Sequence, residues 1–156
     1  EILLNSSIQR SNIAEVLLFF ADRYQHQEEV IKPSLQQGAI VLQDRSFLST
    51  YAYQLALESS DYRFCSNLIY YLSKRTLLPH YIAFLDITVE EMKKRASRRL
   101  DQIESRGDDY YWKVRENYLS FLKKAKTPDF TIYKASTEVN LLAQTIALQI
   151  QSMYEA

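Results

Sequence analysis

The stretch GAIVLQDR, residues 38–45, decides the fold that we predict for this sequence. Residues 39–43 are mainly apolar and β-branched, a pattern typical of a strand that is buried on both faces. The charged pair Asp44 and Arg45 ends the run. Two more runs of strand length, YIAFL at 81–85 and FTIY at 130–133, indicate further strands.

Helical segments separate these strands along the chain. Asn12 and Glu15 have the spacing of a capping box and predict a helix that continues until Pro33 and Gly38. The other expected helices start after the capping pair Thr88 and Glu91, or span residues 61–73, 109–124 and 138–153. Alternating strands and helices predict the α/β class, with a parallel sheet flanked by helices.

The composition limits the class of protein. A chain of 156 residues predicts a single domain, residues 1–156, and 19 basic against 19 acidic side chains leave no net charge. We therefore expect no nucleic-acid partner and, without a long apolar run, no membrane partner. The single cysteine, Cys65, excludes an internal disulfide, predicts a buried inert thiol and fits a cytoplasmic protein.

The end of the predicted strand at 39–43 is the first candidate site, because open parallel sheets bind ligands at the carboxyl ends of their strands. Asp44 and Arg45 stand at this end. An arginine binds phosphate oxygens through two hydrogen bonds, and a carboxylate holds Mg²⁺ or orders its waters. The pair suggests a site for a metal and a phosphate, and the alternative is a solvated turn.

Two other groups of residues suggest related chemistry. Phe19 and Arg23 are four residues apart on one helix face, where a ring stacks on a base and a guanidinium donates to the base edge. In the alternative interpretation, Phe19 belongs to the core. A basic run suggests cations that stabilise a phosphoryl-transfer transition state, and the alternative is a solvated helix face. The run consists of Arg95, Arg98, Arg99 and Arg106.

Four segments carry motifs of a known family. Residues 14–54 contain LLFFADR, IKPSLQQG, a run ending in DR, and STYAYQ. Residues 85–91, LDITVEE, are similar to an LDxxPE segment, residues 100–104 to LDRIE, and residues 113–119 to KVRxxYL. In these motifs and their spacing the sequence resembles the thymidylate kinase family over most of its length, with the lid at about residues 93–108.

The resemblance implies roles for the nucleotide-binding residues. Phe19 stacks on thymine, and Arg23 donates to the base edge. Arg45 holds the acceptor phosphate, and Asp44 helps to hold Mg²⁺ through water. Four residues match the segment that closes over the deoxynucleotide, in which the tyrosine crowds a 2′-hydroxyl: Ser49, Thr50, Tyr53 and Gln54.

The resemblance also implies the reaction. A thymidylate kinase transfers the γ-phosphoryl group of ATP to dTMP and gives dTDP for dTTP synthesis, with Mg²⁺ as cofactor and ATP as co-substrate. Arg98 and Arg99 lie in the expected lid, where they reach the phosphates of ATP. The family has a P-loop nucleoside monophosphate kinase-like fold, and its members are commonly homodimers.

Several features depart from the family pattern. Only Gly38 and Gly107 occur, so no G-x-x-x-x-G-K-[ST] loop exists in the sequence. We therefore expect an N-terminally incomplete chain that lacks the first strand, the P-loop and the first helix. Ser46 replaces an aromatic residue or histidine, Gln102 replaces a lid arginine, and no glycine follows Gln54. Two alternatives stay open: a non-catalytic nucleotide-binding remnant, and a kinase of deoxynucleosides or other deoxynucleotides.

Overall fold

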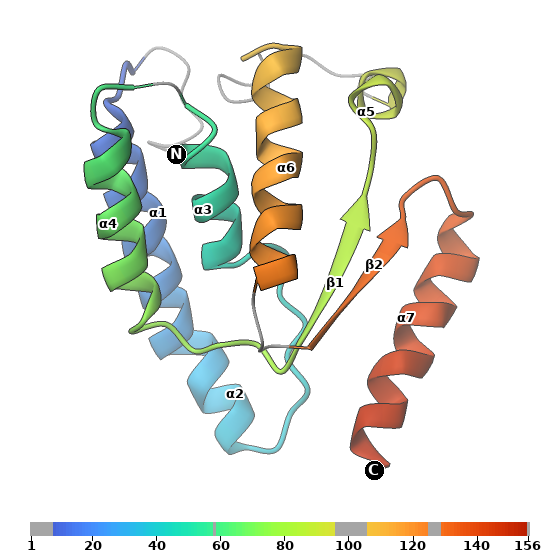
Figure 1. The fold of residues 1–156 in the computed structure, drawn as a ribbon. Helices are drawn as coiled ribbons and strands as arrows, with labels where there is room; N and C mark the ends of the chain where they lie inside the picture. Colours follow the sequence, from blue (N-terminus) through green and yellow to red (C-terminus); the bar gives the residue numbers. More distant parts are fainter. Residues whose placement is uncertain (1–7, 58, 96–105, 125–128, 156) are drawn as a thin grey trace. The chain divides into compact units, whose positions relative to one another are not determined.

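The computed structural model describes residues 8–57, 59–95, 106–124 and 129–155 (Figure 1). The expected lid residues Arg98, Arg99 and Gln102 lie outside this part of the chain. In chain order the elements are α1 (Asn12–His26), the π-helical turn η1 (Gln27–Ile31), α2 (Lys32–Gln36), α3 (Phe47–Gln54), α4 (Tyr62–Ser73), β1 (Tyr81–Asp86), α5 (Val89–Arg95), α6 (Asp108–Lys124), β2 (Asp129–Lys134) and α7 (Val139–Tyr154).

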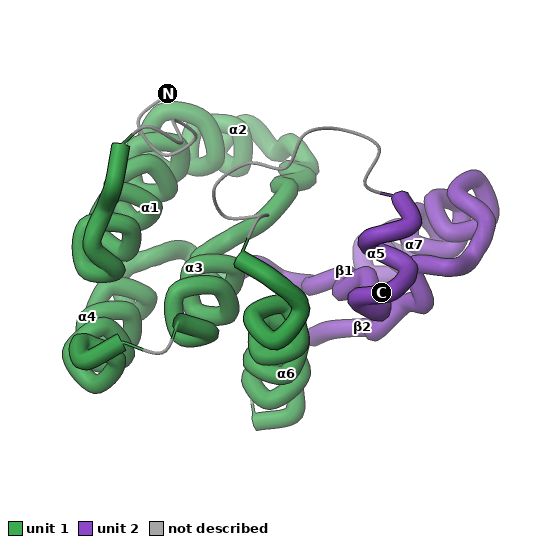
Figure 2. Tube along the Cα trace, turned by 90° about the horizontal axis from the view of Figure 1, so that it is seen from above, with its two compact units in different colours: residues 1–78, 100–124 green, residues 79–99, 125–156 purple. Residues whose placement is uncertain are grey.

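The chain divides into two compact units, which Figure 2 shows in different colours. Unit 1 comprises residues 1–78 and 100–124, and unit 2 comprises residues 79–99 and 125–156. The single domain expected from the length of the chain stays a prediction. No helix of the described segments is long and apolar enough to cross a membrane.

Unit 2 contains the sheet of the described residues, in which β1 and β2 pair in parallel. The register runs from Tyr81 opposite Asp129 to Asp86 opposite Lys134. These are the strands expected at 81–85 and 130–133, and their parallel pairing confirms the α/β class. The capping role of Thr88 is also confirmed, because its Oγ1 accepts the backbone N–H of Glu91 at 3.2 Å.

The strand predicted at residues 39–43 is wrong for the described structure. This segment forms no regular element, and its apolar side chains are open to solvent, with Ile40 54% and Leu42 77% exposed. A parallel strand exists only through hydrogen bonds to a neighbour, and among the described residues the sheet consists of β1 and β2 alone. The apolar pattern is typical of a strand, but among the described residues no strand lies beside it.

The long N-terminal helix also differs from the prediction at both ends. Its N-cap is Ser11, whose Oγ accepts the N–H of Ala14 at 3.2 Å, and not Asn12. The chain stays helical past Pro33, which stands in the first turn of α2, where a missing N–H is tolerated. Gly38 then ends the helix with a φ of 77°, a left-handed conformation that glycine adopts without strain.

The core of unit 1 lies between α1, α3, α4 and α6. One cluster of buried side chains consists of Val16, Phe20, Phe47, Leu55, Cys65 and Ile69, and a second of Ala52, Ala56, Tyr110 and Val114. The expectation of a buried thiol at Cys65 is confirmed, and burial raises its pKa. Since α3 contributes to both clusters, its position is fixed on two sides. Every sequence-predicted nucleotide-binding residue that the structure describes is carried by α1, α3 or the segment between them.

Candidate functional site

The turn before α3 places Asp44 and Arg45 at its N-terminal end. Ser46 is the N-cap of α3, and its Oγ accepts the N–H of Leu48 at 3.3 Å. This local role accounts for a serine at this position, because serine is among the best N-caps. Arg45 has a φ of 66°, which is uncommon for a residue with a side chain and is concentrated at functional sites.

The Arg45 side chain turns back onto α3 and α6. Its guanidinium carbon lies 5.2 Å from the centre of the Tyr53 ring, within the range of a cation–π contact. The Tyr53 ring meets the Tyr118 ring edge to face, with centroids 6.3 Å apart. The Tyr118 hydroxyl in turn donates to Ser49 Oγ at 2.7 Å. Three predicted nucleotide-binding residues thus form one cluster with Tyr118.

Arg23 joins this cluster from α1. Its guanidinium lies 5.2 Å from the Phe19 ring centroid, and one Nη donates to the Phe19 carbonyl at 3.0 Å. Phe19 is half-buried and stands outside the core cluster that contains Val16 and Phe20. Phe19 is therefore not a member of that buried cluster, and its stacking role stays a prediction.

The pKa values of the two arginines of the cluster depend on burial and on the neighbouring charges. Burial lowers the pKa of Arg23, and the charge of Arg45 lowers it further. Burial also acts against the charge of Arg45, but Tyr53, Tyr118 and Asp44 outweigh it and raise the pKa of that guanidinium. Neither arginine forms an ion pair with a carboxylate in the part of the chain that the structure describes. Two cations without a bound carboxylate make this a suitable place for an anionic ligand.

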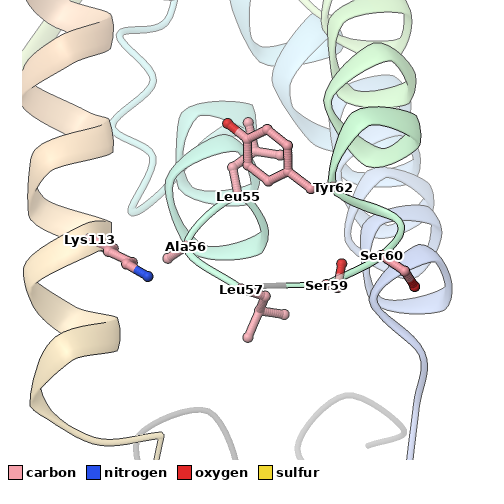
Figure 3. Close-up of a pocket in the computed structure, with 7 residues that line it drawn as sticks. All are labelled: Leu55, Ala56, Leu57, Ser59, Ser60, Tyr62 and Lys113. Atoms are coloured by element: carbon pink, nitrogen blue, oxygen red, sulfur yellow. The ribbon is translucent and has the colours of Figure 1, made fainter.

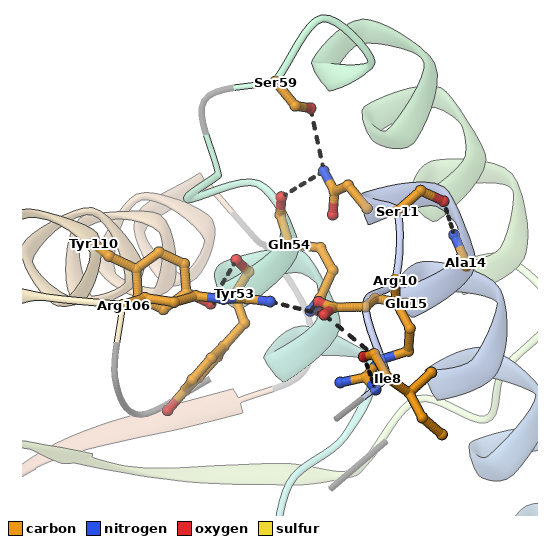
Figure 4. Close-up of polar contacts among 11 residues, drawn as sticks. Ile8, Arg10, Ser11, Ala14, Glu15, Tyr53, Gln54, Ser59, Arg106 and Tyr110 are labelled. Carbon is orange, nitrogen blue, oxygen red and sulfur yellow. Dashed lines mark hydrogen bonds and ion pairs between the residues drawn. The ribbon is translucent and has the colours of Figure 1, made fainter. Parts of the chain in front are cut away.

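A second polar group holds the C-terminal end of α3 (Figure 4). Glu15 is buried, and its Oε1 accepts from Arg106 at 2.7 Å while its Oε2 accepts from Gln54 Nε2 at 3.2 Å. Arg106 also donates to the Tyr110 hydroxyl at 3.2 Å, and that hydroxyl donates to the Tyr53 carbonyl at 3.1 Å. Gln54 is thereby engaged inside the protein.

The other predicted residues have distinct surroundings. Thr50 is buried, and its Oγ1 has no hydrogen-bond partner among the described residues. Asp44 is exposed. Arg95 of the basic run donates to the Ala135 carbonyl at 2.7 Å inside unit 2, and Arg106 is paired with Glu15 in unit 1. The roles expected of Arg98 and Arg99 fall outside the described residues.

A pocket of about 570 Å³ opens elsewhere in unit 1, near the end of α3 (Figure 3). It is lined by Leu55, Ala56, Leu57, Ser59, Ser60, Tyr62 and Lys113. None of these is a predicted site residue, and the lining is mainly apolar, unlike the cluster of arginines and tyrosines.

Comparison with known proteins gives a consistent result. A sequence model of the family described as thymidylate kinase matches residues 1–146. The chain is 38% identical over 138 residues to a thymidylate kinase of Aliarcobacter butzleri (strain RM4018), which covers 88% of this chain and 69% of that protein. The chain belongs to the thymidylate kinase family.

Two further members of this family are also similar to the chain. A thymidylate kinase of Sulfurihydrogenibium sp. (strain YO3AOP1) is 40% identical over 114 residues, covering 73% of this chain and 55% of that protein. A thymidylate kinase of Chlamydia trachomatis serovar L2 is 33% identical over 156 residues, covering 97% and 76%. The matched region therefore spans between 55% and 76% of the length of these three relatives.

Sequence reasoning missed two residues of the candidate site. Tyr118 was noted only as part of the KVRxxYL motif, yet its hydroxyl binds Ser49 and its ring contacts Tyr53. Glu15 was interpreted as a capping residue, whereas it is buried between Arg106 and Gln54. A glutamate within the otherwise apolar run of residues 14–21 was the available signal, because a carboxylate in a core requires a partner.

Proposed function

We propose that this chain carries the acceptor site of a dTMP kinase, in which ATP phosphorylates dTMP. Two observations support the proposal most: Arg45 lies over Tyr53 beside Tyr118, and Arg23, whose charge also interacts with Tyr118, lies over Phe19. Neither guanidinium is paired to a described carboxylate. A flat ring beside two cations suits a base joined to a phosphate.

Each member of this cluster has a task in the proposed reaction. Phe19 stacks on thymine and Arg23 donates to the base edge, while Arg45 neutralises the acceptor phosphate. An oxygen of that phosphate attacks the γ-phosphorus of ATP, a new P–O bond forms, and the bond to the β–γ bridging oxygen breaks to release ADP. Holding the attacking oxygen in line supplies much of the catalysis in such reactions.

Tyr53 would determine the sugar that is accepted. Its ring is fixed by Arg45 on one side and by the rings of Tyr110 and Tyr118 on others. A bulky ring held in this way leaves no room for a 2′-hydroxyl, so deoxyribonucleotides are preferred. Ser49 and Thr50 lie on the same helix, with Ser49 orienting Tyr118.

The described residues of the candidate site offer one carboxylate for a Mg²⁺ ion. Asp44 is an exposed carboxylate, and no group of three or more metal-ligating side chains occurs in the described ranges. Mg²⁺ keeps several waters and binds through one or two carboxylates plus substrate phosphates, so a single aspartate suffices. When bound, Mg²⁺ would offset the negative charge of the phosphates. We propose that Asp44 orders its waters.

The donor side of the reaction is proposed on the family alone. Arg98 and Arg99 would contact the ATP phosphates from the lid. The glycine-rich loop that cradles those phosphates in this family has no counterpart among the 156 residues. A homodimer and a cytoplasmic location are likewise proposals that follow from family membership.

Two measurements test the proposal separately. Calorimetric titration of the chain with dTMP, thymidine and dAMP tests the acceptor site, and Arg45→Ala is expected to weaken dTMP binding at least tenfold while Arg75→Ala, an exposed surface change, leaves it unaltered. A coupled ADP-release assay on the chain preceded by a family phosphate-binding segment tests turnover. If the protein phosphorylates thymidine but not dTMP, the proposal is wrong and the chain is a nucleoside kinase.

A further inference from the structure

A closed ring of hydrogen bonds surrounds the last two residues of α3. Arg106 binds Glu15 at 2.7 Å and Tyr110 at 3.2 Å, and the ring closes because Glu15 binds Gln54 while Tyr110 binds the carbonyl of Tyr53. Tyr53 and Gln54 are neighbours in the sequence. Figure 4 shows Arg106 between the two arms of this ring.

The charges of the ring make Arg106 its central member. Glu15 is only 2% exposed and Gln54 is fully buried, so the carboxylate depends on cations within the protein. Arg106 is the cation that contacts it at hydrogen-bond distance, while Arg10 Nε stands 3.9 Å away. The planar guanidinium serves Glu15 and Tyr110 at once, which the single point charge of a lysine cannot reproduce.

We propose that Arg106 is a positioning residue that fixes Tyr53 and thereby sets the preference for deoxyribonucleotide acceptors. This inference rests on the proposed function, in which the Tyr53 ring excludes a 2′-hydroxyl. Arg106 does not contact the nucleotide in this scheme. It acts through Tyr110 on the Tyr53 carbonyl and through Glu15 on Gln54, and so determines where the Tyr53 ring stands.

Three variants separate positioning from general stability. Arg106→Ala removes the centre of the ring but leaves a buried carboxylate, which destabilises the whole unit. Tyr110→Phe removes the hydrogen bond from Arg106 and the one to the Tyr53 carbonyl, but leaves Arg106 paired with Glu15. Arg106→Lys keeps the charge beside Glu15 but has one donor nitrogen in place of the two that reach Glu15 and Tyr110. Tyr71→Phe, on the exposed side of α4, is the matched control.

The first readout is hydrogen–deuterium exchange of the peptide that covers residues 51–57, and it requires no catalysis. Tyr110→Phe is expected to speed exchange in this peptide about 3- to 10-fold, the effect of losing the hydrogen bond to the Tyr53 carbonyl, without changing peptides from α4. Unchanged exchange in both Tyr110→Phe and Arg106→Ala would overturn the inference, whatever the activity of the protein.

The second readout, on the chain preceded by the same family phosphate-binding segment, is the ratio of kcat/KM for dTMP to that for ribothymidine 5′-monophosphate. We expect this ratio to fall about 3- to 10-fold in Tyr110→Phe and in Arg106→Lys, and to stay at the wild-type value in Tyr71→Phe. If exchange in residues 51–57 becomes faster but the kcat/KM ratio stays unchanged, Arg106 does not set the acceptor preference. A wild-type protein that neither binds nor phosphorylates dTMP would instead refute the proposed function.

Discussion

The guanidinium carbon of Arg45 lies 5.2 Å from the centroid of the Tyr53 ring, and the Arg45 backbone has a left-handed φ of 66°. The left-handed backbone and the ring contact occur at the same residue, directly before α3. Non-glycine residues adopt this conformation at a cost of about 1–2 kcal/mol. The site thus retains an arginine where glycine fits the backbone better.

The first prediction compares Arg45→Gly with Arg45→Ala. Both remove the guanidinium and are expected to weaken dTMP binding equally. Arg45→Gly, which adopts a positive φ freely, should be more stable than Arg45→Ala by about 1 kcal/mol in urea denaturation. Equal stabilities would show that the backbone at this turn is not strained.

The second prediction concerns Tyr53. Tyr53→Ala removes both the ring under Arg45 and the bulk beside the sugar, so the use of ribonucleotide acceptors should improve relative to dTMP. Steady-state kinetics with dTMP and ribothymidine 5′-monophosphate measures this change. Tyr71→Ala, a truncation of a side chain that is 67% exposed, should leave the preference unaltered.

A third prediction uses the adjacent pair Phe19 and Phe20 as matched truncations. Phe20→Ala opens a cavity in the core and should lower the free energy of unfolding by about 3–5 kcal/mol. Phe19→Ala should cost far less stability, because Phe19 is half-buried, but should weaken dTMP binding by about 1–3 kcal/mol. Denaturation and calorimetry on both variants give the comparison; reversed effects would return Phe19 to the core.

The fourth prediction is a loss of stability at alkaline pH. Burial is the main cause that raises the pKa of Tyr110 and of Tyr118, each to about 12, above the ordinary value of 10.0. A pKa raised on folding contributes stability that is complete below pH 10 and is lost as the pH rises toward 12. The free energy of unfolding should therefore fall in this window by about 2–3 kcal/mol for each phenol.

Variants assign that alkaline loss to the two residues. Tyr118→Phe and Tyr110→Phe each remove one titrating group, so each should flatten the decline of the unfolding free energy between pH 10 and pH 12. Tyr71→Phe should not. A decline of wild-type steepness in both site variants would contradict the raised pKa values.

Much of the fold followed from local patterns. The segments 81–85 and 130–133 became β1 and β2, and the helices expected at 61–73, 109–124 and 138–153 formed with ends within about one residue. The segment 39–43 failed because pairing is a property of two strands, and a sequence pattern contains only one of them. The short helix α3 was not predicted, since its residues show neither clear periodicity nor a strong stop signal.

The residues of the candidate site could be predicted from the sequence, but the residues that hold them in place could not. Phe19, Arg23, Arg45, Ser49 and Tyr53 were named from motifs, and the structure brings them together. The pairing of Glu15 with Arg106 joins residues 91 positions apart, and no local rule links them. Arg106 belonged to a basic run in the sequence, and only the fold shows that its charge is used inside the protein.

The π-helical turn η1 gives the helix from α1 to α2 one residue more than a regular α-helix needs, with the Lys32 N–H reaching the Gln27 carbonyl five residues back. Such a turn is the form in which a helix absorbs a single-residue insertion. The exposed residues 28–30 can therefore lose one member and leave both flanking helices in register. In evolutionary terms, relatives are expected to differ from this chain by one residue in length here, without any change in where α2 and Gly38 lie.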